Sequence, residues 1–241
     1  MTYYRADLAR VHHEGFANHA ANCAPGILAL LEPVRARGGL VVELGCGSGL
    51  LTRHLVDAGH RVIATDASPA MLALARATVP DAVDLRLLTL PDDPIPLADA
   101  VVGVGHALNY LPDADAVRRG LRAAAAALRP GGVLALDLCD LAWGALRRDA
   151  EPYGRVGDGW AIVGRNSVPS PDRYVRQLTT FVRESDGRYR RDDERHDNVL
   201  VDTTHVPEWL ADLGLAGVLV GTSFGGEQLP PGLMTVVATR A

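Results

Sequence analysis

One stretch of nine residues constrains the fold of this chain more than any other: Val41-Val42-Glu43-Leu44-Gly45-Cys46-Gly47-Ser48-Gly49. An apolar run passes into three glycines at alternate positions, and apolar residues then recur at helical spacing over residues 49–58. Glycine adopts positive φ at little cost and lets a ligand approach the backbone with no Cβ in the way. The stretch therefore predicts a strand, a ligand-binding turn and a helix.

The chain continues this alternation of strands and helices as far as residue 138. The predicted strands cover residues 40–44, 61–65, 83–88, 100–104 and 133–138, and the predicted helices cover residues 25–35, 49–58, 69–77 and 115–128. Strand, helix and strand in succession make βαβ units, whose strands are parallel. We expect an α/β fold with a Rossmann-like doubly wound sheet that binds ligands at the carboxyl ends of its strands.

The pattern changes after about residue 141. Residues 160–165, 173–184 and 188–201 are rich in β-branched and aromatic residues, and Ser185-Asp186-Gly187 joins the last two as a hairpin turn. A helix over 206–213 and strands over 217–220 and 235–239 then return the chain to the main sheet, which ends antiparallel. We expect one domain, with an N-terminal helical cap over 1–37, a core over 38–140, an antiparallel β insert over 141–204, and a C-terminal helix with the last strands over 205–241.

Charge and cysteine content exclude several classes of partner. The formal charge is −5, all 24 basic residues are Arg, and there is no basic field to follow a phosphate backbone. Nucleic acid is therefore not an expected partner. No apolar run approaches 18 residues, so a membrane is not an expected partner either. Three widely spaced cysteines, with no cluster of metal ligands, are typical of reduced thiols in a cytoplasmic protein without a metal site.

The spacing of the glycines separates two kinds of nucleotide site. A dinucleotide pattern needs a glycine at position 50, where this chain has Leu50. Instead, Glu43-x-Gly45-x-Gly47-x-Gly49, Asp66 after the next strand, Ser68-Pro69-Ala70-Met71-Leu72, and Leu128-Arg129-Pro130-Gly131-Gly132 together resemble the class I S-adenosylmethionine (SAM)-dependent methyltransferases. The resemblance spans residues 40–137. It departs from the family at Thr89 and Leu90, where many members carry an acid near the adenine.

The resemblance implies a role for each part of the glycine loop and its surroundings. Glu43 would orient the amino group of SAM, Asp66 would accept hydrogen bonds from both ribose hydroxyls, and Met71 would pack on the adenine. Ala67 would cover the other adenine face, and Thr89 and Leu90 would meet its edge. The expected cofactor-binding residues are Glu43, Gly45, Cys46, Gly47, Gly49, Asp66, Ala67, Met71, Thr89, Leu90 and Gly105.

Methyl transfer is an in-line displacement, so the enzyme mainly aligns the reactants and, for some acceptors, removes a proton. The chain has no lysine, which leaves His, Glu, Asp and Tyr as proton acceptors. In the resembling family the loop after the fourth strand faces the sulfonium, which makes His106 a catalytic candidate, although it could equally serve only as a hydrogen-bonding group of that loop. Glu194 and His196 share one face of the strand over 188–201 and form a second candidate catalytic pair. The alternative is that this strand is a solvated edge strand with no role in catalysis. The same two alternatives apply to Arg176 and Arg183.

The remaining candidates concern the acceptor. The residues expected to bind it are Tyr4, His12, His13 and Phe16, from a helical lid before the first strand, together with Asn109 and Tyr110. A frayed arm or a dimer contact is the alternative for the lid, and core packing for Tyr110.

The insert resembles, more loosely, bacterial small-molecule N- and O-methyltransferases of natural product biosynthesis. We therefore expect methyl transfer from SAM to N or O of a small molecule, such as a secondary metabolite or a sugar precursor. The alternative is a SAM-binding enzyme of the same fold with non-methylating chemistry, namely intramolecular alkylation or cyclisation. Strand edges of the insert can pair between subunits, which favours a homodimer.

Overall fold

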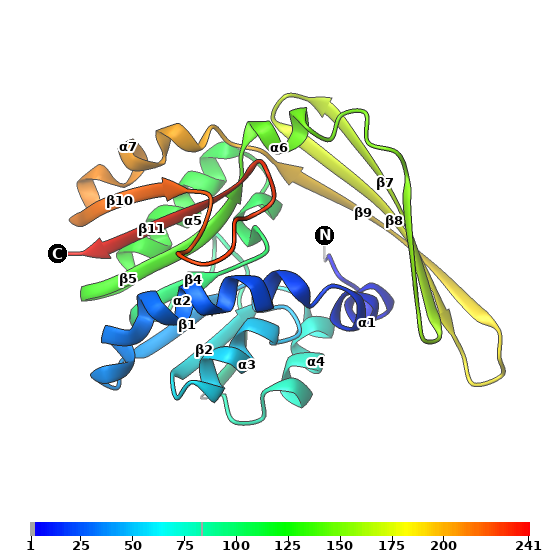
Figure 1. Ribbon diagram of the computed structural model, residues 1–241, viewed down its shortest axis with the longest axis horizontal. Helices are drawn as coiled ribbons and strands as arrows, with labels where there is room; N and C mark the ends of the chain where they lie inside the picture. Colours follow the sequence, from blue (N-terminus) through cyan, green and yellow to red (C-terminus); the bar gives the residue numbers. More distant parts are fainter. Residues whose placement is uncertain (1–2, 83) are drawn as a thin grey trace.

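The computed structural model describes residues 3–82 and 84–241 and contains two sheets. The larger has seven strands in the order β10-β11-β5-β4-β1-β2-β3 (Figure 1). Its parallel strands are β1 (Leu40–Leu44), β2 (Arg61–Asp66), β3 (Asp84–Leu87), β4 (Ala98–Gly103) and β5 (Leu128–Cys139), and β11 (Leu233–Arg240) and β10 (Leu215–Gly221) complete the sheet antiparallel. The predicted fold class is confirmed. Val83, the predicted first residue of the third strand, lies outside the described residues.

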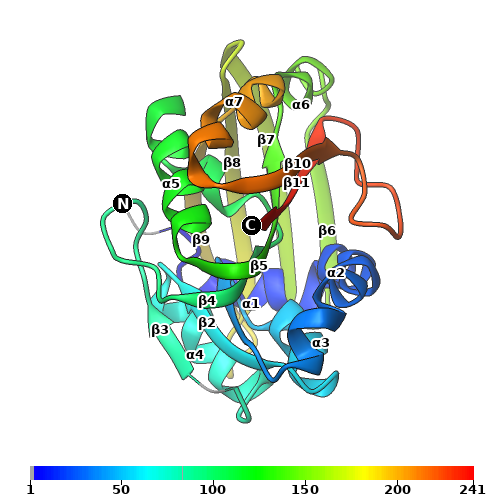
Figure 2. The ribbon, with the colours of Figure 1, turned by 90° about the vertical axis from the view of Figure 1, so that its left-hand side faces the viewer.

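Helices cover both faces of this sheet (Figure 2). The helices α2 (Asn18–Ala36) and α3 (Leu50–Asp57) share one hydrophobic core with Val41 of β1, while α5 (Ala114–Ala126) and α7 (Val206–Leu210) share a second core with its neighbour Val42. Successive strand residues point to opposite faces, so a strand covered on both sides needs a continuous apolar run. This explains why residues 40–44 are apolar apart from Glu43.

The helix α2 begins seven residues earlier than predicted. The sequence analysis began this helix at Pro25, because proline suits a first turn, but Pro25 lies inside a helix that starts at Asn18. Ala20, Cys23 and Ile27 are buried on both sides of the proline and belong to the core against the main sheet. This burial outweighs the hydrogen bond that the proline removes from the helix.

The insert forms a separate antiparallel sheet at the carboxyl ends of the parallel strands (Figure 1). Its strands are β6 (Tyr153–Gly157), β7 (Trp160–Ser170), β8 (Arg173–Arg183) and β9 (Tyr189–Val199), in that order, and the short helix α6 (Leu141–Ala145) connects it to β5. The sequence analysis missed β6 because most of this edge strand is exposed and it carries no alternating pattern. No helix among the described residues has the length and hydrophobicity to cross a membrane.

The N-terminal helix α1 (Ala6–Gly15) connects the two sheets. Its Leu8 and Val11 are buried against Trp160, Ile162 and Leu178 of the insert. The fourth helix, α4 (Pro69–Thr78), begins at a Ser68 side chain that accepts a hydrogen bond from the Met71 N–H and donates one to the carbonyl of Tyr4. The predicted N-terminal cap is thus held over the carboxyl ends of β1 and β2.

Candidate active site

The glycine turn after β1 depends on glycine at each of its three positions. Gly45, Gly47 and Gly49 have φ values of +66°, +54° and +83°. A Cβ on Gly45 would lie 2.5 Å from the Ala107 Cβ, and one on Gly49 would lie 2.7 Å from Val79. The turn therefore needs both the backbone freedom of glycine and the space left by its missing side chain.

This dependence gives a first prediction. We expect Gly45→Ala to weaken S-adenosylhomocysteine (SAH) binding at least about tenfold, because the new Cβ pushes Ala107 toward the ligand. The matched control is Gly59→Ala, which has a similar φ of +87° but open space around the position of the Cβ. Both variants bear the strain of positive φ, about 1 kcal/mol, so calorimetry that finds equal SAH affinities for the two would contradict the steric account.

A cavity of about 380 Å³ opens where β1, β2, β3 and β4 end. Eight of the predicted cofactor residues line it: Gly45, Gly47, Asp66, Ala67, Met71, Thr89, Leu90 and Gly105. They come from four separate strand ends and one helix, so the order of strands in the sheet brings them together.

Among the described residues, Asp66 is the only carboxylate that lines this cavity. Its Oδ2 accepts a hydrogen bond from the Gly47 N–H at 2.8 Å and its Oδ1 accepts one from the Ser68 N–H at 2.8 Å. Removal from solvent raises the pKa of Asp66, and the two backbone donors oppose that rise. Each oxygen of a carboxylate has a second lone pair, so Asp66 can still accept two hydroxyl groups, which fits the diol of a ribose.

Three predicted cofactor residues lie outside the cavity lining. Glu43 is 1% exposed, accepts a 2.6 Å hydrogen bond from the Thr52 hydroxyl, and has a pKa that burial raises to about 7. Cys46 is buried, and Gly49 packs against Val79. Glu43 therefore fastens the start of α3 behind the turn, and in this structure none of the three faces the ligand space.

The predicted N-terminal lid reaches the cavity in part. Tyr4 and His12 line the cavity together with Tyr110, and the hydroxyls of Tyr4 and Tyr110 lie 3.0 Å apart. His13 and Phe16 lie elsewhere, since His13 Nδ1 is 2.9 Å from the Ser48 hydroxyl of the glycine turn and Phe16 packs beside the insert core. Two of the four predicted lid residues are thus in a position to touch a ligand.

His106 lies at the rim, between two residues that line the cavity. Its φ of +51° is unusual for a residue with a Cβ, and its backbone N–H donates to Asp137 Oδ1 at 2.6 Å. The imidazole stacks on the Tyr110 ring at 5.9 Å. Burial and the charge of Arg176 lower the pKa of His106 to about 3, so the ring is neutral near pH 7 and accepts a hydrogen bond more readily than a proton.

Known proteins of similar sequence and fold indicate which kind of ligand this cavity binds. Residues 41–132 match the family described as Methyltransferase domain. A crystal structure of a SAM-dependent methyltransferase from Clostridium acetobutylicum ATCC 824 superposes with a TM-score of 0.81 and 17% identity, covering 97% of each chain. Residues 41–132 therefore form a methyltransferase domain, and the chain has the fold of the class I SAM-dependent methyltransferases.

Two further proteins are similar to this chain. The sugar N-methyltransferase KedS8 from Streptoalloteichus sp ATCC 53650 superposes with a TM-score of 0.80 and 21% identity, covering 100% of this chain and 95% of KedS8. An uncharacterized methyltransferase of Mycobacterium tuberculosis (strain ATCC 25618 / H37Rv) is 37% identical over 153 residues, which is 61% of this chain and 58% of that protein. The chain therefore spans a little over half the length of this relative, and at 17–21% identity the likeness to the solved structures concerns the fold.

Asn109 does not face the cavity. It is fully buried, and its Nδ2 donates to the carbonyls of Cys139 and Val199 while its Oδ1 accepts from the Cys139 N–H. With these groups bonded to backbone, the side chain has no role left for a ligand. The prediction for Asn109 is wrong, because the residue joins β5 to the end of β9 instead.

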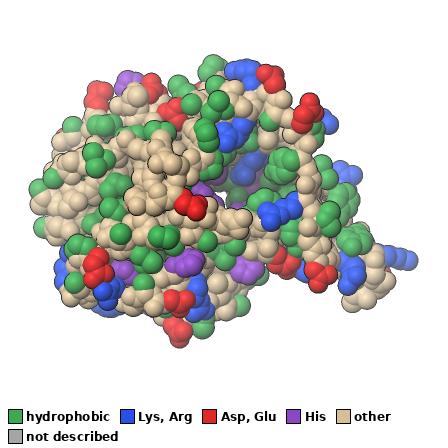
Figure 3. All heavy atoms as spheres, viewed as in Figure 1, with side chains coloured by type: hydrophobic (Ala, Val, Ile, Leu, Met, Phe, Trp, Pro, Cys, Tyr) green, Lys and Arg blue, Asp and Glu red, His purple; other side chains and the backbone are tan. Residues whose placement is uncertain are grey.

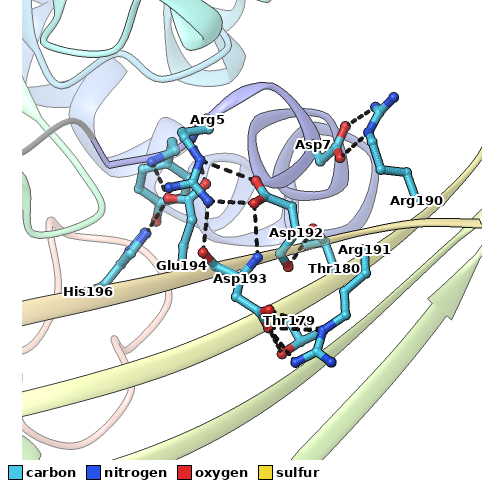
Figure 4. Close-up of polar contacts among 11 residues, drawn as sticks. Arg5, Asp7, Thr179, Thr180, Arg190, Arg191, Asp192, Asp193, Glu194 and His196 are labelled. Atoms are coloured by element: carbon cyan, nitrogen blue, oxygen red, sulfur yellow. Dashed lines mark hydrogen bonds and ion pairs between the residues drawn. The ribbon is translucent and has the colours of Figure 1, made fainter.

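Glu194 and His196 share the buried face that the alternation predicted, and they do not line the cavity (Figure 4). The Glu194 carboxylate accepts hydrogen bonds from the backbone N–H groups of Tyr4 and Arg5, at 2.8 and 2.7 Å, and lies 3.0 Å from His196 Nε2. Burial lowers the pKa of His196, although Glu194 opposes this. The pair thus anchors the start of the lid. We therefore propose that Glu194 and His196 position the lid and do not act in catalysis.

The sequence analysis missed the residues that support the loop after β4. Asp137 accepts hydrogen bonds from the N–H groups of Gly105 and His106 and lies 3.0 Å from His19 Nε2. Burial lowers the pKa of His19, but its bond to Asp137 dominates and raises it to about 10, so the two form an ion pair between a buried Asp137 and a half-buried His19. The sequence does contain a signal for this role, because Asp137 is an acidic residue near the carboxyl end of the predicted buried strand over 133–138.

Proposed function

We propose that this protein transfers the methyl group of SAM to a nitrogen or oxygen of a small molecule, such as a secondary metabolite or a sugar precursor. The arrangement of Asp66 and the glycine turn around one cavity carries the proposal, because it offers a diol acceptor, apolar adenine contacts and close backbone approach in one place. The likeness in fold to KedS8, a sugar N-methyltransferase, supports a small acceptor of this kind.

Each part of the cavity has a separate task in this proposal. SAM, when bound, supplies the electrophilic methyl group, and the ordinary work of the protein is alignment and exclusion of water. Asp66 holds the ribose, while Met71 and Leu90 contact the adenine. Tyr4 and Tyr110 meet across the cavity, so the lid closes the methyl-donating end against water.

The surroundings of Tyr110 favour an acceptor nitrogen without its extra proton. Burial and, to a smaller extent, the Arg176 charge lower the pKa of His12, His106 and His196. The same charge would lower the pKa of an ammonium group bound there, which leaves the nitrogen with a free lone pair for attack. His106, as a neutral imidazole, then accepts a hydrogen bond from the acceptor and orients it.

Mass spectrometry tests this function directly. The protein is incubated with methyl-labelled SAM and a set of amino sugars, phenols and hydroxylated small molecules, with Asp66→Ala as the inactive control. A product one labelled methyl group heavier than its acceptor supports the proposal. Conversion of an acceptor to a product of unchanged mass would instead support cyclisation or another non-methylating reaction.

A further inference from the structure

The insert sheet brings three polar side chains into one row that faces the main body. Arg176 of β8 lies directly opposite Asn166 of β7 on one side and His196 of β9 on the other. Side chains of directly opposed strand residues point to the same face of a sheet. His196 lies 3.3 Å from the Tyr110 hydroxyl, which fixes that face as the one toward the active site.

A hollow lies between the insert and the main body. Figure 3 shows the molecule indented between the main body and the insert, with Arg, His and hydrophobic side chains gathered inside the indentation. The residues around the row connect it to the cofactor cavity, because His106 packs on Tyr110 at 5.9 Å and on Trp143 at 6.0 Å, and Trp143 packs on Tyr174 at 6.1 Å. The row therefore lies on the acceptor side of the site.

Arg176 brings a positive charge into this space without a carboxylate to balance it. Its Nη2 donates to the Tyr110 hydroxyl and lies 3.4 Å from His196 Nδ1, and both of these partners are uncharged. No Asp or Glu oxygen lies within 4.0 Å of it in the part of the chain that the structure describes. The nearby carboxylate of Glu194 is already bonded to two backbone N–H groups and His196.

Three polar atoms of the row and of Trp143 are also unpartnered. The Arg176 Nε, the Trp143 indole nitrogen and the Asn166 Oδ1 are buried and have no hydrogen-bond partner among the described residues. Arg176 is partly buried and its Nε is fully buried, and a charge or polar atom removed from water is costly unless a counter-charge and hydrogen bonds satisfy it. The Arg176 Nε–H and the Trp143 indole N–H are hydrogen-bond donors, and the Asn166 amide can rotate to present its NH2 group. Together with the unbalanced charge of Arg176, these donors suit an anion.

We propose that Arg176, with Asn166 and Trp143, binds an anionic group of the methyl acceptor, a carboxylate or a phosphate. The inference rests on the proposed function, since the acceptor is defined by it. The carboxylate of SAM is a second source of the same chemistry. Because SAH carries that carboxylate too, SAH binding and anion binding in the presence of SAH separate the two sources.

Anion binding would also change the protonation of the neighbouring histidines. The positive charge of Arg176 contributes to the low pKa of His106 and His12, with burial as the larger cause. An anion on Arg176 cancels that charge and therefore raises both pKa values, with Asp137 and His19 as the other charged neighbours of His106. The acceptor would thus make His106 a better proton acceptor as it binds.

Calorimetry with inorganic phosphate tests the site. The protein is saturated with SAH, and phosphate is titrated at constant ionic strength into the wild type, Arg176→Gln, Arg176→Lys and Arg165→Gln. Arg165 is exposed and precedes Asn166 in β7, so its side chain points to the opposite face of the sheet from Asn166 and Arg176. It therefore serves as the matched control. NMR titration of the His106 ring with and without phosphate gives a second readout.

We expect the wild type to bind phosphate with a millimolar dissociation constant. Arg176→Gln should lose at least about tenfold in phosphate affinity, and Arg176→Lys should lose less than Arg176→Gln. The phosphate affinity of Arg165→Gln should change by less than about twofold. SAH affinity should stay within about threefold in all four proteins, and phosphate should raise the His106 pKa in the wild type and in Arg165→Gln but not in Arg176→Gln. Equal phosphate affinity in the wild type and Arg176→Gln would overturn the proposal, as would absence of phosphate binding by the wild type. Loss of SAH affinity in Arg176→Gln would assign the anion to the cofactor instead. Failure of the wild type to bind SAH would refute the proposed function, while phosphate titration of the free protein would still test Arg176.

Discussion

Asp66→Ala should weaken SAH binding by about 100-fold or more, the largest effect on ligand affinity that we expect from one substitution, because two charge-assisted hydrogen bonds to the ribose are each worth about 1.5–3 kcal/mol. The substitution also leaves the N–H groups of Gly47 and Ser68 without their acceptor. The shape of the glycine turn is therefore affected along with the contact to the ligand. Isothermal titration calorimetry with SAH measures the loss.

The matched control for this prediction is Asp84→Ala. Asp84 begins the neighbouring strand β3, pairs with the exposed Arg86, and has no contact with the cavity. We expect its SAH affinity to stay within about twofold of the wild type, as for other surface substitutions away from a site. If Asp66→Ala folds and binds SAH as tightly as Asp84→Ala, then Asp66 does not hold the ribose.

Asp137→Asn should lower the free energy of unfolding by about 3 kcal/mol, because it removes the buried partner of the half-buried His19 and weakens the acceptor of two backbone N–H groups. Asp137 is 2% exposed, and it also holds the N–H groups of Gly105 and His106 in the loop beside the cavity. We therefore expect SAH binding to weaken as well. Urea unfolding followed by circular dichroism gives the stability difference, with the exposed Asp115→Asn as a control that should change it by less than about 0.5 kcal/mol.

The pH dependence of stability gives an independent check of this ion pair. The folded pKa of His19 is raised to about 10, so its contribution is complete below its unfolded pKa of about 6.5 and is lost as the pH rises toward 10. Burial alone would raise the pKa of Asp137, but His19 outweighs this and lowers it, so that contribution is lost only in strong acid. The stability difference between wild type and Asp137→Asn should therefore shrink between pH 6.5 and 10. A difference that stays constant over this range would contradict the pairing.

The first half of the fold could be predicted because its signals are local. The strands β1 and β2, the turn between them and the start of α4 each follow from short patterns of apolar residues, glycines and a serine cap. The start of α2 could not be predicted in this way, since the packing of Ala20 and Cys23 outweighs a proline. The edge strand β6 gives no burial pattern at all.

The candidate site shows the same division. Cofactor contacts such as Asp66 and Met71 follow local motifs and line the cavity as predicted. The alternation also placed Glu194 and His196 on one face, but it could not indicate that the backbone of Tyr4, about 190 residues away in the chain, would occupy the carboxylate. The orphaned Nε of Arg176 likewise depends on the distance between two sheets, which no short pattern encodes.

A crystal structure of the protein with SAH tests the central claim most directly. The account predicts the ribose hydroxyls on the carboxylate of Asp66, the adenine between Met71 and Ala67 with Leu90 at its edge, and the sulfur directed toward Tyr110 and His106 with Arg176 beyond it. SAH bound elsewhere, or bound in this cavity with its sulfur pointing away from Tyr110, would contradict it.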